Sequence, residues 1–401
     1  MRPPVIAFGM NSLFAVRQFL PETLAMVRDR GYAPVVIAPP DRAGAPPNGL
    51  PDAEYRFVPV ERDISPAADL LSLFRIWRVL RTVRPEVANM STPKMALLGG
   101  LAGWLAGVPR RFYTLRGLRY ETTRSWKRAV LVACERIACA CAHRVICISR
   151  SVRDTLVRDG IAPAGKLTLL GERASEGIAL PRGAAAAESA PLLRRAAGIP
   201  EDAEVIGFTG RLTRDKGIPE LVEAFLLLRR EGRRVRLLLL GDFEAGDPVP
   251  AAVADRIRTD PDIHWLGYVA DPRPYYFLMD VFVFPTRREG LGRVLLEAAA
   301  AGKPVVSTLT TGVVDAEIDG VTGVLVPPGD APALARATAE LLSDPERAAR
   351  MGRAARRLVE EQFDNAVYLE RLAAVLQSFE PSPAGNRRTG SIGNPRGGRS
   401  L

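Results

Sequence analysis

Short apolar runs alternate with amphipathic segments of helical length along almost the whole chain. In the first half the runs are VIAFG, VVIA, EVANMS, RRFYTL and VICIS, and segments such as LLSLFRIWRVLRTV separate them. Buried strands that alternate with helices of about 10 to 15 residues form parallel sheets with helices on both faces. The alternation therefore predicts an α/β fold with a doubly wound sheet.

The same alternation begins a second time after a segment rich in alanine, glycine and proline. The runs AEVIGFTG, VRLLLLGD, IHWLGYV, VFVFPT, KPVVST and GVLVPPG then predict the strands of a second sheet. We predict domains at residues 1–178 and 201–364, joined by a linker at 179–200. Residues 365–380 are predicted to be a final helix that returns to the first domain, and residues 381–401 a disordered tail.

The composition limits the cellular locations and the classes of partner that fit this chain. The net charge of +10 favours an anionic partner such as a nucleotide, a nucleic acid or an acidic lipid. Residues 95–107 form the longest apolar stretch, which is shorter than the roughly 20 residues that span a membrane. We expect no secretory signal at the start of the chain.

Four cysteines lie close together in the segment CERIACACAHRVIC, without paired CxxC spacing. A helix that runs into a buried strand explains them better than a metal site does. Reduced, buried thiols predict a cytoplasmic protein. The thiols are Cys134, Cys139, Cys141 and Cys147.

Two glutamates flank a Gly-Leu-Gly turn in RREGLGRVLLEAAAAGKPVV, residues 287–306. Glu289 precedes the turn, and Glu297 lies in an apolar helical run, where a carboxylate needs a partner. A surface pair with Arg293, worth at most about 0.5 kcal/mol, is the alternative to a ligand contact at Glu297. The turn would place the free N–H groups of a helix N-terminus at a strand end, which is an anion site, through Gly290, Leu291 and Gly292.

A glycine and two cations follow another predicted strand, in VIGFTGRLTRDKG. Gly210 would let a phosphate approach the backbone, and Arg211 and Lys216 would neutralise a diphosphate. A solvated loop is the alternative. Further along, Asp315 and Glu317 are either solvated turn acids or a support for the site.

The aspartates of the segment DPD are Asp260 and Asp262, which resemble a metal-binding pattern. Their position in a loop before a strand favours a turn. We assign no metal.

Five segments of the second half together resemble the C-terminal half of glycosyltransferase family four. They are GRLTRDKG, LLLLGD, IHWLGYV, FPTRREGLGRVLLEAAAAGKPVV and DGVTGVLVPPGD, in family order over residues 203–345. The family consists of retaining enzymes with the GT-B fold, in which two facing doubly wound Rossmann-like domains enclose an interdomain cleft. In the first half, NMSTPKMALLGGLAG, YTLRGLRYETT and ICISRSVRD resemble the bacterial branch that builds lipid-linked or capsular polysaccharides.

The resemblance implies roles for particular residues. Arg211 and Lys216 would hold the donor diphosphate, and Glu289 would face the donor sugar; these three form the implied catalytic set. Glu297 would bind the ribose hydroxyls. The remaining donor-binding residues would be Gly210, Gly290, Leu291, Gly292, His264 and Trp265, the last two beside the base. The acceptor side would include Asn11, Ser12, Thr92, Lys94, Arg116 and Arg119.

The implied reaction moves a hexose or an N-acetylhexosamine to a polyprenyl-linked or saccharide acceptor in surface polysaccharide synthesis. It needs no cofactor beyond its nucleotide-sugar substrate, which we expect to be UDP-linked, with GDP-mannose as the second choice. A non-hydrolysing nucleotide-sugar epimerase and a non-catalytic nucleotide-sugar-binding subunit are the alternatives.

The basic and aromatic residues of segment 110–128 predict docking to the inner surface of the cell membrane. They include Phe112, Tyr113, Tyr120 and Trp126. We therefore expect no nucleic acid partner, and a peripheral membrane position alongside the cytoplasmic one.

Overall fold

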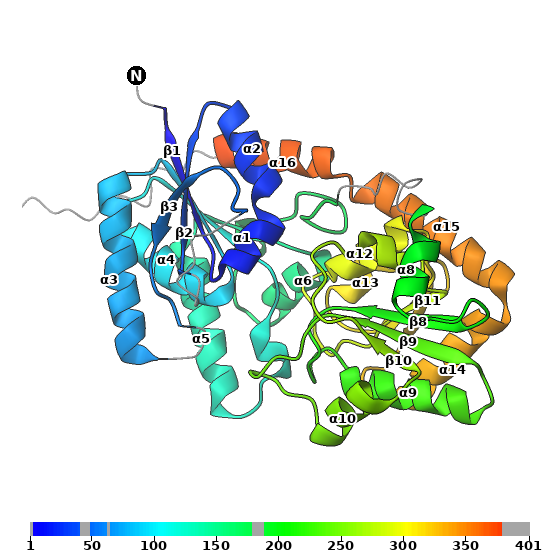
Figure 1. Cartoon of the computed structure of the whole chain (residues 1–401). Coiled ribbons are helices and arrows are strands. Elements are labelled where there is room, and N and C mark those ends of the chain that lie inside the picture. Colours follow the sequence, from blue (N-terminus) through cyan, green and yellow to red (C-terminus); the bar gives the residue numbers. More distant parts are fainter. Residues whose placement is uncertain (1–2, 41–48, 62–64, 179–187, 379–401) are drawn as a thin grey trace, which may run out of the picture.

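The computed structural model describes residues 3–40, 49–61, 65–178 and 188–378. Two parallel sheets with helices on their faces form the two halves of the molecule (Figure 1). The predicted tail, 381–401, and residues 179–187 of the predicted linker lie outside the described residues. The rest of that linker includes a short helix, α8 (Ala190–Ala196).

The sheet of the first half has seven parallel strands in the order β3-β2-β1-β4-β5-β6-β7. The alternation predicted five of these strands and missed the two edge strands, β3 and β7. The strands are β1 (Val5–Gly9), β2 (Ala33–Ala38), β3 (Glu54–Phe57), β4 (Val87–Ser91), β5 (Arg110–Leu115), β6 (Arg144–Cys147) and β7 (Leu167–Thr168).

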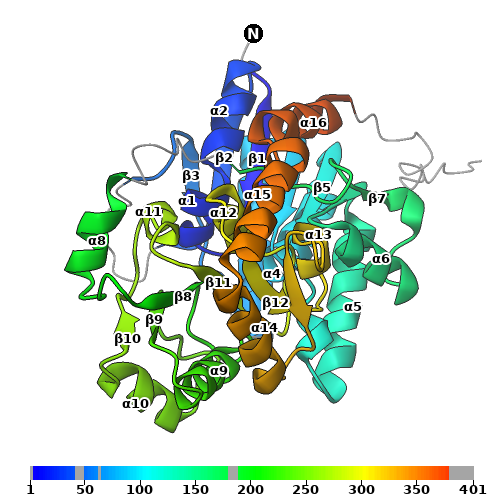
Figure 2. The ribbon, with the colours of Figure 1, turned by 90° about the vertical axis from the view of Figure 1, so that its right-hand side faces the viewer.

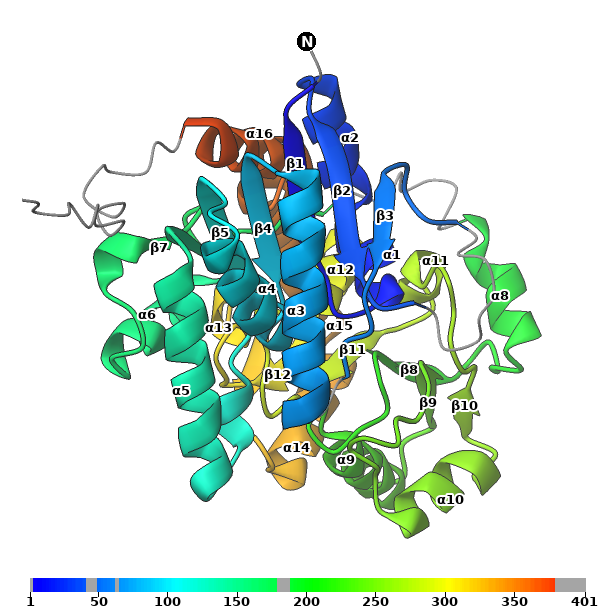
Figure 3. The ribbon, with the colours of Figure 1, turned by 90° about the vertical axis from the view of Figure 1, so that its left-hand side faces the viewer.

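Helices cover both faces of this sheet, because successive side chains of a strand point to opposite faces. Ile6 and Phe8 of β1 pack with Leu372 near the end of the chain, whereas Ala7 packs with Met95 on the other face. Figure 3 shows α3, α4 and α5 in front of the sheet. The helices of this half are α1 (Leu13–Phe19), α2 (Pro21–Asp29), α3 (Pro66–Val83), α4 (Pro93–Leu105), α5 (Trp126–Cys141) and α6 (Arg150–Arg158), with 3-10 turns η1 (Arg119–Thr122) and η2 (Ala164–Lys166).

The segment between the first two apolar runs, residues 16–31, has the length of one helix but forms parts of two in the structure. Leu20 ends α1, and Pro21 is the first residue of α2. A proline inside a helix removes a backbone hydrogen bond and clashes with the preceding turn, so the chain starts a new helix there.

The sheet of the second half has six parallel strands in the order β10-β9-β8-β11-β12-β13. They are β8 (Glu204–Thr209), β9 (Val235–Leu240), β10 (Ile263–Trp265), β11 (Val281–Phe284), β12 (Val305–Thr308) and β13 (Gly323–Val326). The helices are α9 (Ile218–Arg230), α10 (Ala251–Thr259), α11 (Arg273–Tyr276), α12 (Arg293–Ala300), α13 (Val313–Ala316), α14 (Ala331–Ser343) and α15 (Pro345–Gln362).

The last helix, α16 (Asn365–Ser378), lies against the first half (Figure 2). The side-chain amide of Asn365 donates to Glu22 of α2 at 2.6 Å, and Arg30 forms an ion pair with Glu370 at 2.7 Å. The chain therefore passes between the halves twice, near Ile178 and near Phe363, whose backbones are hydrogen-bonded at 3.0 Å. The domain limits given above stay predictions.

No helix within the described part of the chain combines the length and the apolar character that crossing a bilayer requires. The four cysteines are free thiols; Cys139, Cys141 and Cys147 are buried, as the sequence predicts, whereas Cys134 is only half-buried.

Candidate active site

The two sheets meet at the carboxyl ends of their strands. The loop after β5 and the loop after β11 touch through their backbones: a Cβ added to Gly290 would lie 2.0 Å from the carbonyl oxygen of Arg116. A Cβ on Gly312, after β12, would lie 2.5 Å from the carbonyl carbon of Gly290. Only glycine permits such approaches. Ligands of open α/β sheets bind at these strand ends, so the candidate site lies here.

A second contact between the halves is polar. The backbone N–H of Ser151, in the first turn of α6, donates to the carboxylate of Asp315 at 2.9 Å. The Ser151 hydroxyl accepts from the N–H of Gly312 at 2.7 Å, and Arg173 donates to the Asp315 carbonyl at 2.7 Å. Asp315 therefore supports the junction of the halves, which rejects the alternative of a solvated turn acid.

Glu317 is also no solvated acid. Its side chain is buried, and one carboxyl oxygen accepts from the Thr322 hydroxyl at 2.6 Å. Burial raises its pKa from 4.5 to about 8, against the smaller lowering effects of Thr322 and Arg173. The folded protein thus keeps a proton on Glu317 at neutral pH.

This proton makes stability depend on pH. The unfolded chain releases it near pH 4.5 and the folded protein near pH 8, so unfolding becomes more favourable as pH rises between these values. We expect Glu317→Gln, which is neutral at every pH, to match the wild type below pH 4.5 and to melt several degrees higher at pH 8. Thermal melts of both proteins from pH 4 to pH 9 measure this, and a difference that stays constant with pH would contradict it.

The predicted catalytic residues Lys216 and Glu289 form an ion pair. Lys216 follows β8 and Glu289 follows β11, and these two strands are neighbours in the sheet. The side chains are 14% and 17% exposed, and the lysine Nζ lies 5.1 Å from the ring centroid of Phe284. Glu289 also accepts from the N–H of Gly290 at 3.2 Å. A cation and an anion are thus held together at the predicted diphosphate position.

Arg211, the third predicted catalytic residue, does not contact the Lys216–Glu289 pair within the described residues. Its guanidinium forms an ion pair with Glu244, in the loop after β9, and its side chain is 47% exposed. Near Lys216 the structure instead brings in Arg288, which pairs with Asp215 at 3.1 Å. Burial raises the pKa of Asp215, but the Thr213 hydroxyl, Lys216 and Arg288 outweigh it and lower the pKa overall.

Glu297 lies inside the protein on α12, whose first turn follows Gly292. Its carboxylate accepts from the Nε of Arg293 at 3.3 Å and from the hydroxyl of Tyr276 at 3.0 Å. The Arg293 contact that the alternative interpretation required is present, but the Glu297 side chain is only 14% exposed, so it is no surface pair. Burial raises the pKa of Glu297, and Arg293 opposes this shift.

His264 and Trp265 lie on the edge strand β10, which β9 and β8 separate from β11. The Nδ1 of His264 is 2.8 Å from the carbonyl oxygen of Ala197, and the indole N–H of Trp265 donates to Gly241 at 2.8 Å. No contact between these two residues and the Lys216–Glu289 pair is seen among the described residues.

The predicted acceptor residues all follow strands of the first sheet. Asn11 and Ser12 follow β1, and the Ser12 hydroxyl accepts from Ala15 at 3.1 Å, so it caps α1. Thr92 and Lys94 follow β4, and Lys94 pairs with Asp69 at 2.7 Å. After β5, Arg116 pairs with Glu176 at 3.0 Å, and Arg119 begins η1 with an exposed side chain.

Several buried polar atoms at these strand ends have no hydrogen-bond partner among the described residues. Burial of such a group is unfavourable unless it is hydrogen-bonded. The atoms are Thr92 Oγ1, Arg116 Nε, Arg288 Nε and Thr310 Oγ1, and they come from both halves.

The prediction that the aromatic residues of segment 110–128 lie on the surface is wrong for three of the four. Phe112, Tyr113 and Tyr120 are each 1% exposed, because β5 is an inner strand and η1 packs beneath α5. Of the four aromatic residues only Trp126, at the start of α5, is exposed, at 69%.

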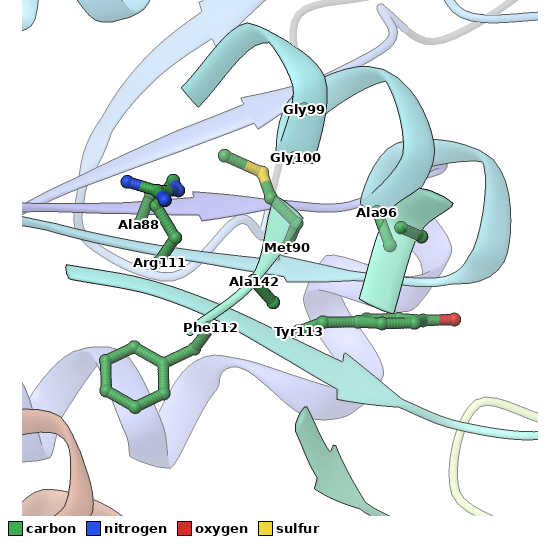
Figure 4. A pocket seen from close by; sticks show the side chains of 10 residues that line it. Ala88, Met90, Ala96, Gly99, Gly100, Arg111, Phe112, Tyr113 and Ala142 are labelled. Atoms are coloured by element: carbon green, nitrogen blue, oxygen red, sulfur yellow. The ribbon is translucent and has the colours of Figure 1, made fainter. Parts of the chain in front are cut away.

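A cavity near Tyr113 is too small to be a ligand site. It lies between the sheet and helices α4 and α5, at the amino end of β5, and Met90 and Arg111 also line it (Figure 4). Its volume is about 10 Å³, which holds at most about one water molecule.

The aspartates of the DPD segment pair with arginines. Asp260 binds Arg229 at 3.0 Å, and Asp262 binds Arg229 at 3.0 Å and Arg236 at 3.1 Å. Asp260 also accepts from the backbone N–H of Asp262 at 3.1 Å, as a turn requires.

Two residues of the site escaped sequence reasoning. Glu176, in the segment GERASEGI, is buried and binds arginines from both halves. Tyr276 reaches Glu297 from α11. The only sequence pattern that indicates Glu176 is a glutamate before the glycine of a turn. The neighbouring residues in the sequence do not indicate which arginines it binds.

Known proteins match both halves of the chain. The description "Glycosyl transferases group 1" fits residues 203–344, and "Glycosyl transferase 4-like domain" fits residues 15–171. The capsular polysaccharide biosynthesis glycosyltransferase CapM of Staphylococcus aureus is 34% identical over 322 residues, which cover 80% of this chain and 84% of CapM.

A second relative is the UDP-Gal:alpha-D-GlcNAc-diphosphoundecaprenol alpha-1,3-galactosyltransferase of Escherichia coli. It is 25% identical over 271 residues, or 66% of this chain and 69% of the relative. Among solved structures, Anabaena HepE in complex with UDP and glucose superposes with a TM-score of 0.74 at 20% identity, over 93% of this chain and 99% of HepE.

Proposed function

Because this chain belongs to the glycosyltransferases and has the GT-B fold, we propose that it is a retaining enzyme of surface polysaccharide synthesis. It moves a hexose or an N-acetylhexosamine from a UDP-linked donor to a polyprenyl-linked or saccharide acceptor. The relatives support this choice: CapM is named for capsular polysaccharide, and the galactosyltransferase for a UDP donor and a diphosphoundecaprenol acceptor. Their names do not favour an epimerase.

The proposal rests on the Lys216–Glu289 pair, because Lys216 provides positive charge at the position from which the diphosphate leaves. The bond between the sugar C1 and the donor phosphate oxygen breaks, and a new bond from C1 to the acceptor oxygen forms on the same face. The departing phosphate takes the acceptor's hydroxyl proton, so no separate base is needed. Lys216 and the free N–H groups at the start of α12 stabilise the negative charge that develops on the phosphate.

Glu289 holds Lys216 in place before the donor binds, and then faces the sugar. Glu297, inside the protein and held by Arg293 and Tyr276, offers its remaining lone pairs to the ribose hydroxyls. The acceptor binds on the other side of the sugar, near Thr92 and Arg116, which follow strands β4 and β5 of the first sheet. Arg211 adds its charge once the donor displaces Glu244.

Radiolabelled donors test this function. The purified chain is incubated with a membrane extract and labelled UDP-glucose, UDP-galactose, UDP-N-acetylglucosamine or GDP-mannose. We expect label in the lipid fraction from one UDP donor, and an α linkage by NMR from an α-linked donor. Transfer from GDP-mannose alone would reject the UDP assignment, an inverted linkage would reject retention, and label in no acceptor would reject transfer.

The lipid-linked acceptor calls for a membrane surface, and the first half offers one at the starts of α3 and α5. Leu70, Leu71 and Phe74 of α3 are 68%, 48% and 52% exposed, and Trp126 of α5 is 69% exposed. The exposed cations Arg119, Arg124 and Lys127 lie close to Trp126 in the chain. Apolar side chains next to cations suit an anionic bilayer, where each cation contributes about 1 kcal/mol. This surface keeps the exposed residues of segment 110–128 and adds the apolar residues of α3 in place of the buried Phe112, Tyr113 and Tyr120.

We expect the double variant Phe74→Ser and Trp126→Ser to bind phosphatidylglycerol vesicles at least roughly tenfold more weakly than the wild type, since it loses two inserted rings. Cosedimentation measures this. Leu192→Ser is the matched control, because Leu192 is 72% exposed on α8, in the other half. Equal binding by all three proteins would refute the surface.

A further inference from the structure

A row of alternating charges joins the two halves beside the proposed donor site. Arg116 of the first half donates to one oxygen of Glu176 at 3.0 Å, and Arg293 of the second half donates to the other at 3.2 Å. Arg293 also donates to Glu297 at 3.3 Å. Glu176 is the centre of this row, and its side chain is only 7% exposed.

Both oxygens of Glu176 are therefore occupied by guanidinium groups from different halves. A charged hydrogen bond of this kind fixes the donor group more firmly than a neutral one does. Since the guanidinium of Arg293 is planar and binds two carboxylates, its orientation toward Glu176 also sets its orientation toward Glu297. The position of Glu297 thus depends on a residue that does not touch it.

Glu176 lies where the chain passes between the halves. Its neighbour Gly177 approaches α16 so closely that an added Cβ would lie 2.5 Å from the Cα of Asn365. The N–H of Ile178 donates to the carbonyl of Phe363 at 3.0 Å. Glu176 therefore binds both arginines at the place where the chain connects the two halves.

We propose that Glu176 is a positioning residue for the donor. It holds Arg293 so that Glu297 presents its carboxylate to the donor ribose, and through Arg116 it links this orientation to the first half. The inference rests on the proposed function, because Glu297 binds the ribose only if the substrate is a nucleotide sugar.

UDP titration by calorimetry tests the proposal in the full chain. Glu176→Gln preserves the size of the side chain and removes its charge, and we expect it to weaken UDP binding roughly tenfold. Arg293→Met should have a similar effect, and the double variant should bind no more weakly than Arg293→Met alone. If the two effects multiply, Glu176 does not act through Arg293 and the proposal is overturned.

Sugar transfer gives a second measurement. Glu176→Gln should raise the donor KM about tenfold while kcat falls less than threefold, since ground-state binding is lost and the reacting groups are intact. Equal loss in kcat with an unchanged KM would overturn the proposal. Glu86→Gln is the control: it removes a charge that pairs with Arg110 at 3.0 Å at the amino end of β4, and UDP affinity should not change.

A measurement without ligand separates this inference from the proposed function. Thermal unfolding of Glu176→Gln, Glu297→Gln and the double variant forms a cycle, and residues linked through Arg293 give shifts in Tm that do not add. Additive shifts overturn the proposal whatever the donor is. Non-additive shifts in a chain that binds no UDP support the charge row and reject the UDP donor. If Glu176→Gln does not fold, Glu176→Asp, which keeps the charge but reaches less far, takes its place in all three measurements.

Discussion

Lys216→Ala is expected to lower kcat/KM for sugar transfer roughly 1,000-fold, or about 4 kcal/mol of transition-state stabilisation, while the protein stays folded. The lysine Nζ is a half-buried cation beside the anion site at the start of α12, and no other lysine lies directly after a strand of the second sheet within the described residues. Its loss leaves the departing diphosphate without that charge. Steady-state kinetics and a thermal melt measure the two parts of this prediction.

The matched control is Lys166→Ala. Lys166 precedes β7 and donates to the carbonyl of Ala140 at 3.0 Å, away from the strand ends where the halves meet. It should keep normal kcat/KM. Glu289→Ala should reduce transfer as Lys216→Ala does, because Glu289 orients the lysine and faces the sugar. Normal turnover by Lys216→Ala or by Glu289→Ala would refute the site.

Gly290→Ala should reduce activity at least roughly 100-fold by moving the two halves apart. The added methyl carbon would lie 2.0 Å from the carbonyl oxygen of Arg116 and 3.1 Å from Ile148 Cγ2, and the first of these contacts is impossible without movement of the backbone. The movement would separate donor and acceptor groups that must be in contact during transfer. The cores of the two sheets are untouched, so the melting temperature should fall only slightly.

Small-angle scattering should show a larger radius of gyration for Gly290→Ala, and kinetics the loss of transfer. Gly165→Ala is the control, because no heavy atom lies within 4 Å of its added methyl carbon and its backbone is not left-handed. Full activity of Gly290→Ala with an unchanged radius would show that the contact between Gly290 and Arg116 is dispensable.

The Lys216–Glu289 pair and the contact between Gly290 and Arg116 differ in how far the sequence predicts them. Lys216 and Glu289 were placed at strand ends by local pattern, and neighbouring strands of a parallel sheet bring their carboxyl ends to one edge. Their ion pair follows from that arrangement. The contact of Gly290 with Arg116 has no such local signal, because it joins loops from different sheets.

Arg211 and Glu297 show the same limit within one half. The sequence places both near strand ends or helix starts, but their partners come from elsewhere: Glu244 after β9 for Arg211, and Tyr276 on α11 for Glu297. Segment 110–128 is a clearer failure. The alternation of charged and aromatic residues in this segment is typical of a surface. However, β5 is an inner strand of the sheet, and three of the segment's four aromatic residues are buried.

The sequence by itself determined the two sheets, most of their strands and helices, the strand-end positions of Lys216 and Glu289, and the position of Glu297 on a helix. These follow from periodicity and turn residues, which act over a few neighbours in the chain. Only the tertiary structure decided that Glu176 joins Arg116 to Arg293 and that Asp315 binds Ser151. Such contacts connect residues from 60 to 164 positions apart. They depend on how the two sheets face each other, and that arrangement is a property of the assembled cores rather than of any single segment.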